Sequence, residues 1–166
     1  FPEKAMTWIV PYSAGGGFDT IARLYSEILP DTLPNDVNVT VRNVTGAGGL
    51  TGANAIYRAD PDGYTFGWWN VPGFAVSQMT RDTAYDLREV SWIGRVAAYR
   101  FAAVVAPDSD LQTPADLLEA DRPISFASAG RASTGYIFAE ILADLNGFET
   151  KHVTGYEGAY ESRTAV

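Results

Sequence analysis

The sequence predicts an α/β fold built around a mostly parallel sheet. Short apolar segments typical of strands alternate with segments whose apolar residues follow helical spacing, and this alternation is typical of βαβ units. Three loops of glycine and other small residues each follow a strand and precede a helix. The pattern begins again after Trp92, which predicts a second unit of the same kind.

The first unit contains three expected strands and two expected helices. Apolar spacing predicts a helix over residues 19–29. A second helix is expected between the second glycine loop and the turn sequence at residues 60–63. The expected strands, which are rich in β-branched and aromatic residues, cover residues 5–12, 37–44 and 64–71.

The second unit begins with a long apolar stretch, residues 91–107. We expect two strands here, with a crossing near residues 99–101. Thr113 and Pro114 are expected to begin a short helix as its N-cap and first residue. A strand, an amphipathic helix that ends at a glycine, and a further strand with a glycine-bearing loop follow at residues 123–130, 133–147 and 151–158.

The composition restricts the function. The 166 residues are 46% hydrophobic, which predicts a packed core rather than disorder. A net charge of −8 argues against binding nucleic acid or an anionic membrane surface. No apolar run approaches the roughly 18 residues of a membrane-spanning helix. The chain opens directly on an apolar strand, as expected for a processed protein, and the absence of cysteine excludes disulfides.

The three glycine loops are the candidate binding elements, at residues 13–19, 45–52 and 128–135. The first N–H groups of a helix have no partner within the helix, and the helix dipole adds positive potential. Ligands of open α/β sheets bind beyond the carboxyl ends of the strands. The loops therefore suggest an anion or carboxylate site. The alternative is that the glycines only allow tight turns between strands and helices.

Nucleotide and enzyme sites fit the sequence less well. The dinucleotide pattern G-x-G-x-x-G is not completed, since Thr51 stands where the last glycine should be. The nucleophile pattern G-x-S-x-G is absent around Ser128 and Ser133. His152 is the only histidine and so the only candidate imidazole base. No acidic or histidine cluster has metal-ligand spacing. We therefore expect neither an enzyme, nor a metal, nor a cofactor.

Four further residues are candidates for a role in the core or at the site. Asp19 lies in the first turn of its helix, where a carboxylate complements the dipole; alternatively it orients the glycine loop or accepts from a ligand hydroxyl or amine. Trp68 and Trp69 are adjacent in an expected strand, so they should face opposite sides of the sheet and pack in the core. Asn70, at the carboxyl end of that strand, is better placed to contact a ligand.

Several of these stretches resemble one known family. The opening FPEKAMTWIVPYSAGGGFDTIAR closely resembles that of the solute-binding proteins of tripartite tricarboxylate transporters, the TctC or Bug family. The segments NVTGAGGLTGANAIYRADPDGYTF, DLREVSWIGRVA, SFASAG and HVTGYEG are similar to later landmarks of the family. Departures occur at Ala5, Arg131 and Glu157, and they concern the identity of the ligand rather than the family.

The resemblance implies a bacterial periplasmic protein, its signal peptide removed, with a type II periplasmic-binding-protein-like fold. Residues 1–100 would form the first α/β lobe, and residues 101–166 part of the second. The family's chains continue beyond this point and return to the first lobe, so we expect a piece of a longer protein. The implied function is capture of a small organic acid in the cleft between the lobes and its delivery to the transporter's membrane subunits, without membrane insertion.

The resemblance also implies a set of ligand-binding residues. They belong to the glycine loops and the end of the third strand: Tyr12, Ser13, Ala14, Gly15, Gly16, Gly17, Asp19, Thr45, Gly46, Ala47, Gly48, Asn70, Ser128, Ala129, Gly130 and Ser133. Two other functions stay open from the residues alone. One is an α/β hydrolase that uses Ser133 or Ser128, and the other is a sensory module that presents a ligand to a membrane receptor.

Overall fold

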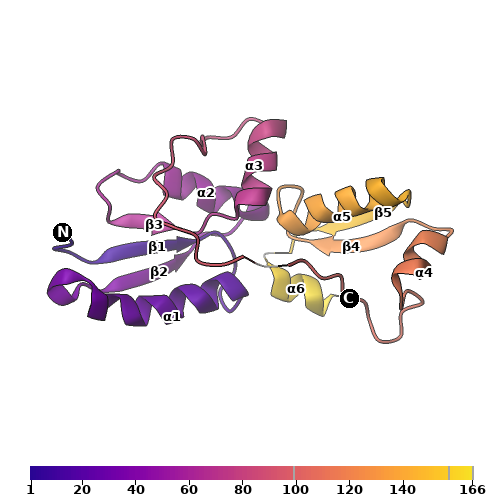
Figure 1. Ribbon diagram of the computed structural model, residues 1–166, viewed down its shortest axis with the longest axis horizontal. Helices are drawn as coiled ribbons and strands as arrows, with labels where there is room; N and C mark the ends of the chain where they lie inside the picture. Colours follow the sequence, from indigo (N-terminus) through magenta and orange to yellow (C-terminus); the bar gives the residue numbers. More distant parts are fainter. Residues whose placement is uncertain (99, 157, 166) are drawn as a thin grey trace.

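The computed structural model describes residues 1–98, 100–156 and 158–165. Tyr99, at the expected strand crossing, and Glu157, one of the family departures, lie outside the described residues. Two separate parallel sheets, each with its own helices, lie side by side along the longest axis of the molecule (Figure 1). The α/β prediction is therefore confirmed. The division into lobes at residue 100 stays a prediction.

The first sheet has three parallel strands in the order β2-β1-β3. Trp8, in the central strand, lies opposite Val41 on one side and Phe66 on the other. Alternate residues of β1 pack against α1 on one face of the sheet, while α2 packs on the other, where Ile56 fills the space beside Gly67. The elements are β1 (Met6–Val10), α1 (Gly17–Thr32), β2 (Val39–Asn43), α2 (Leu50–Tyr57), β3 (Thr65–Gly67) and α3 (Val71–Thr80).

The second sheet is the parallel pair β4-β5, in which Phe126 lies opposite His152. Thr113 is the N-cap of α4 as predicted, and it also forms a capping box with Asp116. Gly147 ends α5 in the left-handed conformation at φ 77°. Short 3-10 turns occur at Pro34–Asp36 and Ala47–Gly49. The elements are α4 (Pro114–Glu119), β4 (Ile124–Ser128), α5 (Thr134–Asn146), β5 (Thr150–Thr154) and α6 (Ala159–Thr164).

Two expectations about these elements were wrong. The two strands expected in residues 91–107 do not form in the described part of that stretch, because no neighbouring strand pairs with it. Its apolar side chains lie exposed, Ile93 at 88% and Val104 at 61%. The strand expected over residues 64–71 was too long, because β3 covers only Thr65–Gly67, and helix α3, which was not expected, begins at Val71. Pro72 lies in its first turn, where the missing N–H of proline has no helical partner to lose.

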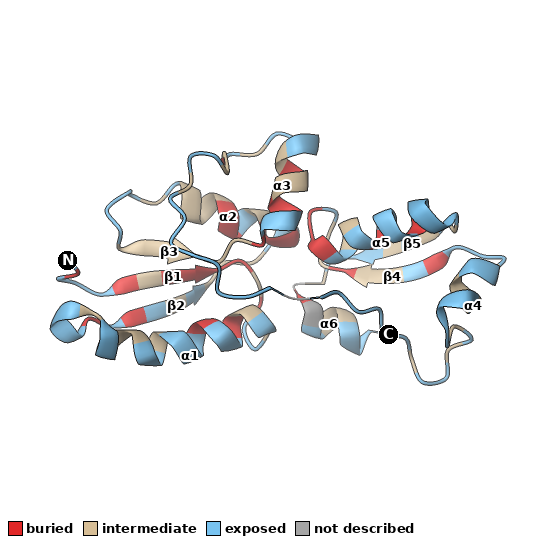
Figure 2. Cartoon of the chain, in the orientation of Figure 1, coloured by how far each residue is buried: buried red, intermediate tan, exposed pale blue. Residues whose placement is uncertain are grey.

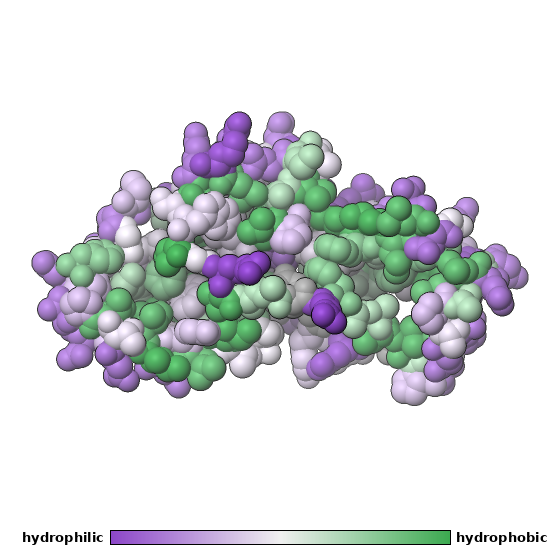
Figure 3. Space-filling model, in the orientation of Figure 1, coloured by the Kyte–Doolittle hydropathy of each residue, from purple (hydrophilic) through white to green (hydrophobic). Residues whose placement is uncertain are grey.

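Two apolar clusters form the core of the first sheet, one on each face. One contains Trp8 and Val10 with Trp68 packed against it, and the other contains Phe74 and Tyr85 with Trp69. The two tryptophans thus pack on opposite sides, as predicted. Buried residues gather around β1 and at the junction of the two sheets (Figure 2). Exposed apolar side chains also occur, and Figure 3 shows them gathered over α5.

Candidate ligand-binding site

The first glycine loop is held in shape by Asp19. Gly15 has φ +79°, a conformation that glycine adopts without strain, and its N–H donates to Asp19 Oδ2 at 2.8 Å. Arg23 Nε donates to the same oxygen at 2.9 Å, and Asn43 Nδ2 donates to Oδ1 at 2.9 Å. Asn43 also donates to the carbonyl of Tyr12 at 2.9 Å. The carboxylate thus ties the loop to α1 and β2.

The electrostatics of Asp19 fit this role. Only 2% of the surface of Asp19 is exposed to solvent. Burial alone would raise the pKa of the Asp19 carboxyl, but the hydrogen bonds from Arg23, the Gly15 N–H and Asn43 outweigh burial and lower it. Both oxygens already accept hydrogen bonds from the protein. Of the alternatives for Asp19, these contacts favour orientation of the glycine loop over direct contact with a ligand.

Tyr12 and Asn70 lie beside this loop and contact each other. Asn70 is buried, and its Nδ2 donates to the Tyr12 hydroxyl at 3.1 Å. The Tyr12 ring stacks on Phe18 at 4.8 Å between centroids, and the indole N–H of Trp68 donates to the Phe18 carbonyl at 3.0 Å. A Cβ at Gly49 would lie 3.2 Å from the Tyr12 ring. Tyr12 thus contacts both Asn70, which follows β3, and the second glycine loop.

The second glycine loop meets the third across the junction of the lobes. A Cβ at Gly48 would lie 2.8 Å from the backbone nitrogen of Ser133, and one at Gly130 would lie 3.5 Å from the nitrogen of Gly48. A Cβ at Gly73, in α3, would lie 2.8 Å from Thr134 Oγ1. Glycines therefore let the two lobes approach backbone to backbone here.

A third contact joins the first glycine loop to α6. A Cβ at Gly158 would lie 2.7 Å from Ser13 Oγ, and the Ser13 hydroxyl donates to Glu161 Oε2 at 3.3 Å. Sequence reasoning did not find Glu161, because 148 residues separate it from Ser13 and no motif marks it. The expected ligand donor Ser13 thus faces a carboxylate of the protein.

The two serines of the third loop differ from each other. Ser128 is 3% exposed, and its Oγ has no hydrogen-bond partner among the described residues. Ser133 is the N-cap of α5, and its Oγ accepts from the Tyr136 N–H at 3.4 Å. Thr134 Oγ1, next to Ser133, is also buried without a partner in the described part of the chain. A buried hydroxyl without a partner is available to a ligand.

The structure brings the expected residues to the carboxyl ends of the strands, where the two lobes meet. They differ in exposure. Buried members are Ser13, Asp19, Gly48, Asn70, Ser128 and Ser133; half-buried members are Tyr12, Gly16, Thr45, Ala129 and Gly130; exposed members are Ala14, Gly15, Gly17, Gly46 and Ala47.

His152 does not contact either serine in the described structure. Its Nε2 pairs with Glu140 Oε1 at 2.8 Å, and its ring lies 3.8 Å from that of Tyr136 between centroids. These three residues and Arg131 line a cavity of about 320 Å³ between α5 and β5. The described residues therefore contain no Ser-His pair, and no group of three or more metal-ligating side chains.

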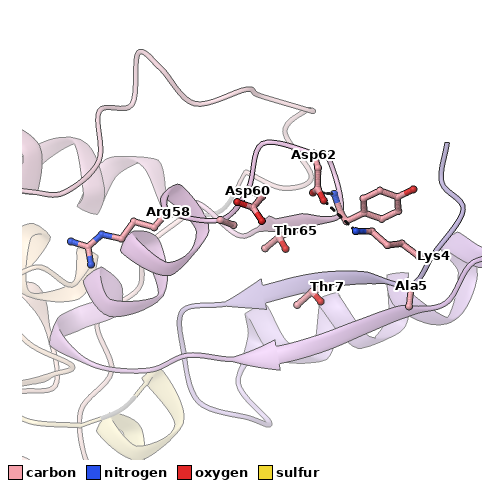
Figure 4. A pocket seen from close by; sticks show the side chains of 9 residues that line it. Lys4, Ala5, Thr7, Arg58, Asp60, Asp62 and Thr65 are labelled. Atoms are coloured by element: carbon pink, nitrogen blue, oxygen red, sulfur yellow. Dashed lines mark hydrogen bonds and ion pairs between the residues drawn. The ribbon is translucent and has the colours of Figure 1, made fainter.

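A larger cavity, about 470 Å³, lies at the opposite end of the first sheet. Lys4, Asp60, Asp62 and Thr65 line it (Figure 4), and Lys4 Nζ pairs with Asp62 at 3.3 Å. It opens at the amino ends of β1 and β3, whereas ligands of open α/β sheets bind at the carboxyl ends. The glycine loops, rather than this groove, are the candidate site.

Two α/β lobes that meet through glycine loops at their strand ends define a bilobal binding protein. The family described as tripartite tricarboxylate transporter family receptor, TctC, matches residues 21–166. The chain belongs to this family, whose members are periplasmic solute-binding proteins rather than enzymes. No helix in the described part of the chain is long and apolar enough to cross a membrane.

Curated relatives match almost the whole chain. A UPF0065 protein from the tcbD-tcbE intergenic region of Pseudomonas sp. strain P51 is 31% identical over 165 residues, which are 96% of this chain and 48% of that protein. A UPF0065 protein from the gbd 5′ region of Cupriavidus necator is 27% identical over 170 residues, covering 100% of this chain and 51% of that protein. The chain thus spans about half the length of the curated relatives it matches.

Solved structures have the same fold. One, described as a periplasmic transporter, is 30% identical with a TM-score of 0.80, and the match covers 99% of this chain and 56% of the other. An R. palustris protein solved with adipate is 23% identical with a TM-score of 0.76, and the match covers 99% of this chain and 56% of that protein. MatC from Rhodopseudomonas palustris with bound malate is 23% identical with a TM-score of 0.73, and the match covers 99% of this chain and 57% of MatC. These matches confirm the periplasmic-binding-protein fold.

Proposed function

We propose that the protein containing this chain captures a small organic acid between its two lobes and delivers it to the membrane subunits of a tripartite transporter. The meeting of the glycine loops at the lobe junction carries this proposal. Backbone N–H groups at strand-to-helix turns can bind a carboxylate, and the buried Ser128 hydroxyl can add a donor. The protein would act in the periplasm after removal of a signal peptide.

The chemistry of the relatives supports the choice of ligand. Two proteins of the same fold were solved with the dicarboxylates adipate and malate. Delivery to a tripartite transporter rests on the family to which the chain belongs. A sensory role would use the same cleft, and binding of purified membrane subunits to the loaded protein would distinguish transport from sensing.

Ligand binding by the full-length protein tests the proposal. Native mass spectrometry of the freshly purified protein should find a co-purified acid, and calorimetry with di- and tricarboxylates, amino acids and aromatic acids should find a ligand. Gly16→Val should weaken binding strongly, because a Cβ at Gly16 would already lie 3.3 Å from the Ser13 carbonyl oxygen, so a β-branched side chain would displace the first loop. Equal affinity of the parent and both Gly16→Val and Ser128→Ala for the best ligand would place the site elsewhere.

A further inference from the structure

The junction of the lobes contains a carboxylate supplied by the protein itself. Glu161, in α6, accepts a hydrogen bond from the hydroxyl of Ser13, which lies in the first glycine loop and is 7% exposed. Glu161 Oε2 would also lie 3.3 Å from a Cβ at Gly158. The second lobe therefore presents a carboxylate oxygen to a loop expected to hold a carboxylate ligand.

Among the described residues, no cationic side chain forms an ion pair with Glu161. Arg23, on the helix that follows the first glycine loop, pairs with Asp19. Arg163, on the same helix as Glu161, lies over the Tyr160 ring instead. No described Lys or Arg forms an ion pair with Glu161. The side chain is half-buried, so its charge is only partly screened by water.

We infer that Glu161 determines which acids the cleft accepts. It favours an acid whose carboxylate is held by the second and third glycine loops and whose second functional group, beside Ser13, is a cationic amine, and it disfavours an acid with a second carboxylate there. An ammonium group can donate to Glu161 and neutralise it, whereas a second carboxylate would meet a like charge. This inference rests on the proposed function and narrows its ligand class to zwitterionic amino acids.

Matched pairs of linear acids test the selection directly. Each pair shares the same chain and one carboxylate, and differs only in the far group: succinate and β-alanine, glutarate and 4-aminobutanoate, adipate and 5-aminopentanoate. Calorimetry of the full-length protein gives the affinity ratio of amine to dicarboxylate within each pair. The parent should prefer the amine in at least one pair, and Glu161→Gln should lower that ratio about tenfold or more, as expected for loss of a close charge pair.

Glu119→Gln is the matched control, because it makes the same change of charge at an exposed site at the end of α4, far from the lobe junction (Figure 1). It should leave the ratio unchanged. Glu161→Asp, which retains the charge on a shorter side chain, should keep the preference for the amine. Thermal melts of all variants establish that each is folded.

The possible failures are distinguishable. If the parent binds none of these acids and none of the wider calorimetry panel, the proposed function is wrong, and the inference falls with it. If the parent binds only acids outside these pairs, the inference is wrong and the proposed function stands. If acids bind but Glu161→Gln changes the ratio no more than Glu119→Gln, the inference is wrong and the proposed function stands. If Glu161→Gln tightens binding of both members of every pair equally, Glu161 only competes with ligands for Ser13, and selection by charge is overturned.

Discussion

Gly48 lies so close to Ser133 that a Cβ on it would be 2.8 Å from the Ser133 backbone nitrogen. Gly48→Ala should therefore hold the lobes apart. Gly147→Ala is the control, since Gly147, at the end of α5, also has a positive φ but has open space around its Cβ position. Each variant should lose about 1 kcal/mol from backbone strain. Only Gly48→Ala should weaken ligand affinity and enlarge the radius of gyration, as small-angle scattering of the full-length protein can measure.

Asp19→Asn should destabilise the first lobe by about 1.5–3 kcal/mol, the usual range for hydrogen bonds to a charged group. The folded-state pKa of Asp19 is lowered from 3.8, so its stabilising contribution is present above that value and disappears as pH falls through the folded pKa. The difference in free energy of unfolding between parent and variant should therefore shrink between about pH 5 and about pH 2. A difference that is constant across these pH values would contradict the role assigned to Asp19.

Ser128→Ala and Ser133→Ala should separate binding from stability. Ser128 Oγ has no described partner, so its removal should leave the melting temperature unchanged while lowering ligand affinity about tenfold through one lost donor. Ser133→Ala removes the N-cap of α5 and should cost about 1 kcal/mol of stability. Calorimetry and denaturant unfolding measure the two effects. A destabilised Ser128→Ala variant with unchanged affinity would show that Ser128 is structural.

Tyr85 should ionise late in a spectrophotometric titration. Burial raises its pKa to about 12, and its hydroxyl donates to the Phe74 carbonyl at 2.9 Å. Because the neutral form is favoured in the folded state, its stabilising effect is present below the ordinary pKa of 10.0 and is lost as pH rises toward 12. Tyr85→Phe should remove the latest phenolate transition and cost about 1 kcal/mol. Survival of that transition in the variant would assign it elsewhere.

The isolated 166-residue chain should self-associate. Ile93 and Met79 are 88% and 84% exposed, and Leu145 on α5 is 77% exposed. Exposed apolar patches of this kind favour association. Light scattering across a dilution series should show oligomers, and the dye ANS should bind. A monodisperse monomer with a sharp, cooperative melt would contradict this expectation.

Local sequence patterns correctly predicted the features that depend only on residues close to one another in the sequence. The alternation of strands and helices, the N-cap at Thr113 and the glycine that ends α5 all depend on neighbours within a few residues, and they are present. The strands expected in residues 91–107 failed for a different reason. Their apolar composition fits a strand, but a strand needs a hydrogen-bonded neighbour, and local composition does not say whether one is present.

The candidate site was predictable only in part. Glycine loops placed after strands are visible in the sequence, and the second and third of them meet at the junction of the two sheets. The contact of Ser13 with Glu161 joins residues 148 positions apart, and no spacing rule predicts it. For Asp19, the sequence left several roles open, because its partners Arg23 and Asn43 come from a neighbouring turn and a neighbouring strand. The tertiary contacts of Asp19, rather than its residue type, favour orientation of the glycine loop.

The hydrogen bond from Trp68 to the Phe18 carbonyl gives the protein an intrinsic fluorescence reporter. The indole N–H is bonded to the start of α1 at 3.0 Å, and Phe18 in turn stacks on Tyr12 beside the first glycine loop. A shift of that loop would lengthen this bond and change the polarity around the indole. Ligand titrations of the full-length protein can therefore be followed by tryptophan emission, without an attached dye, and Trp68→Phe identifies the share of the signal that comes from the loop.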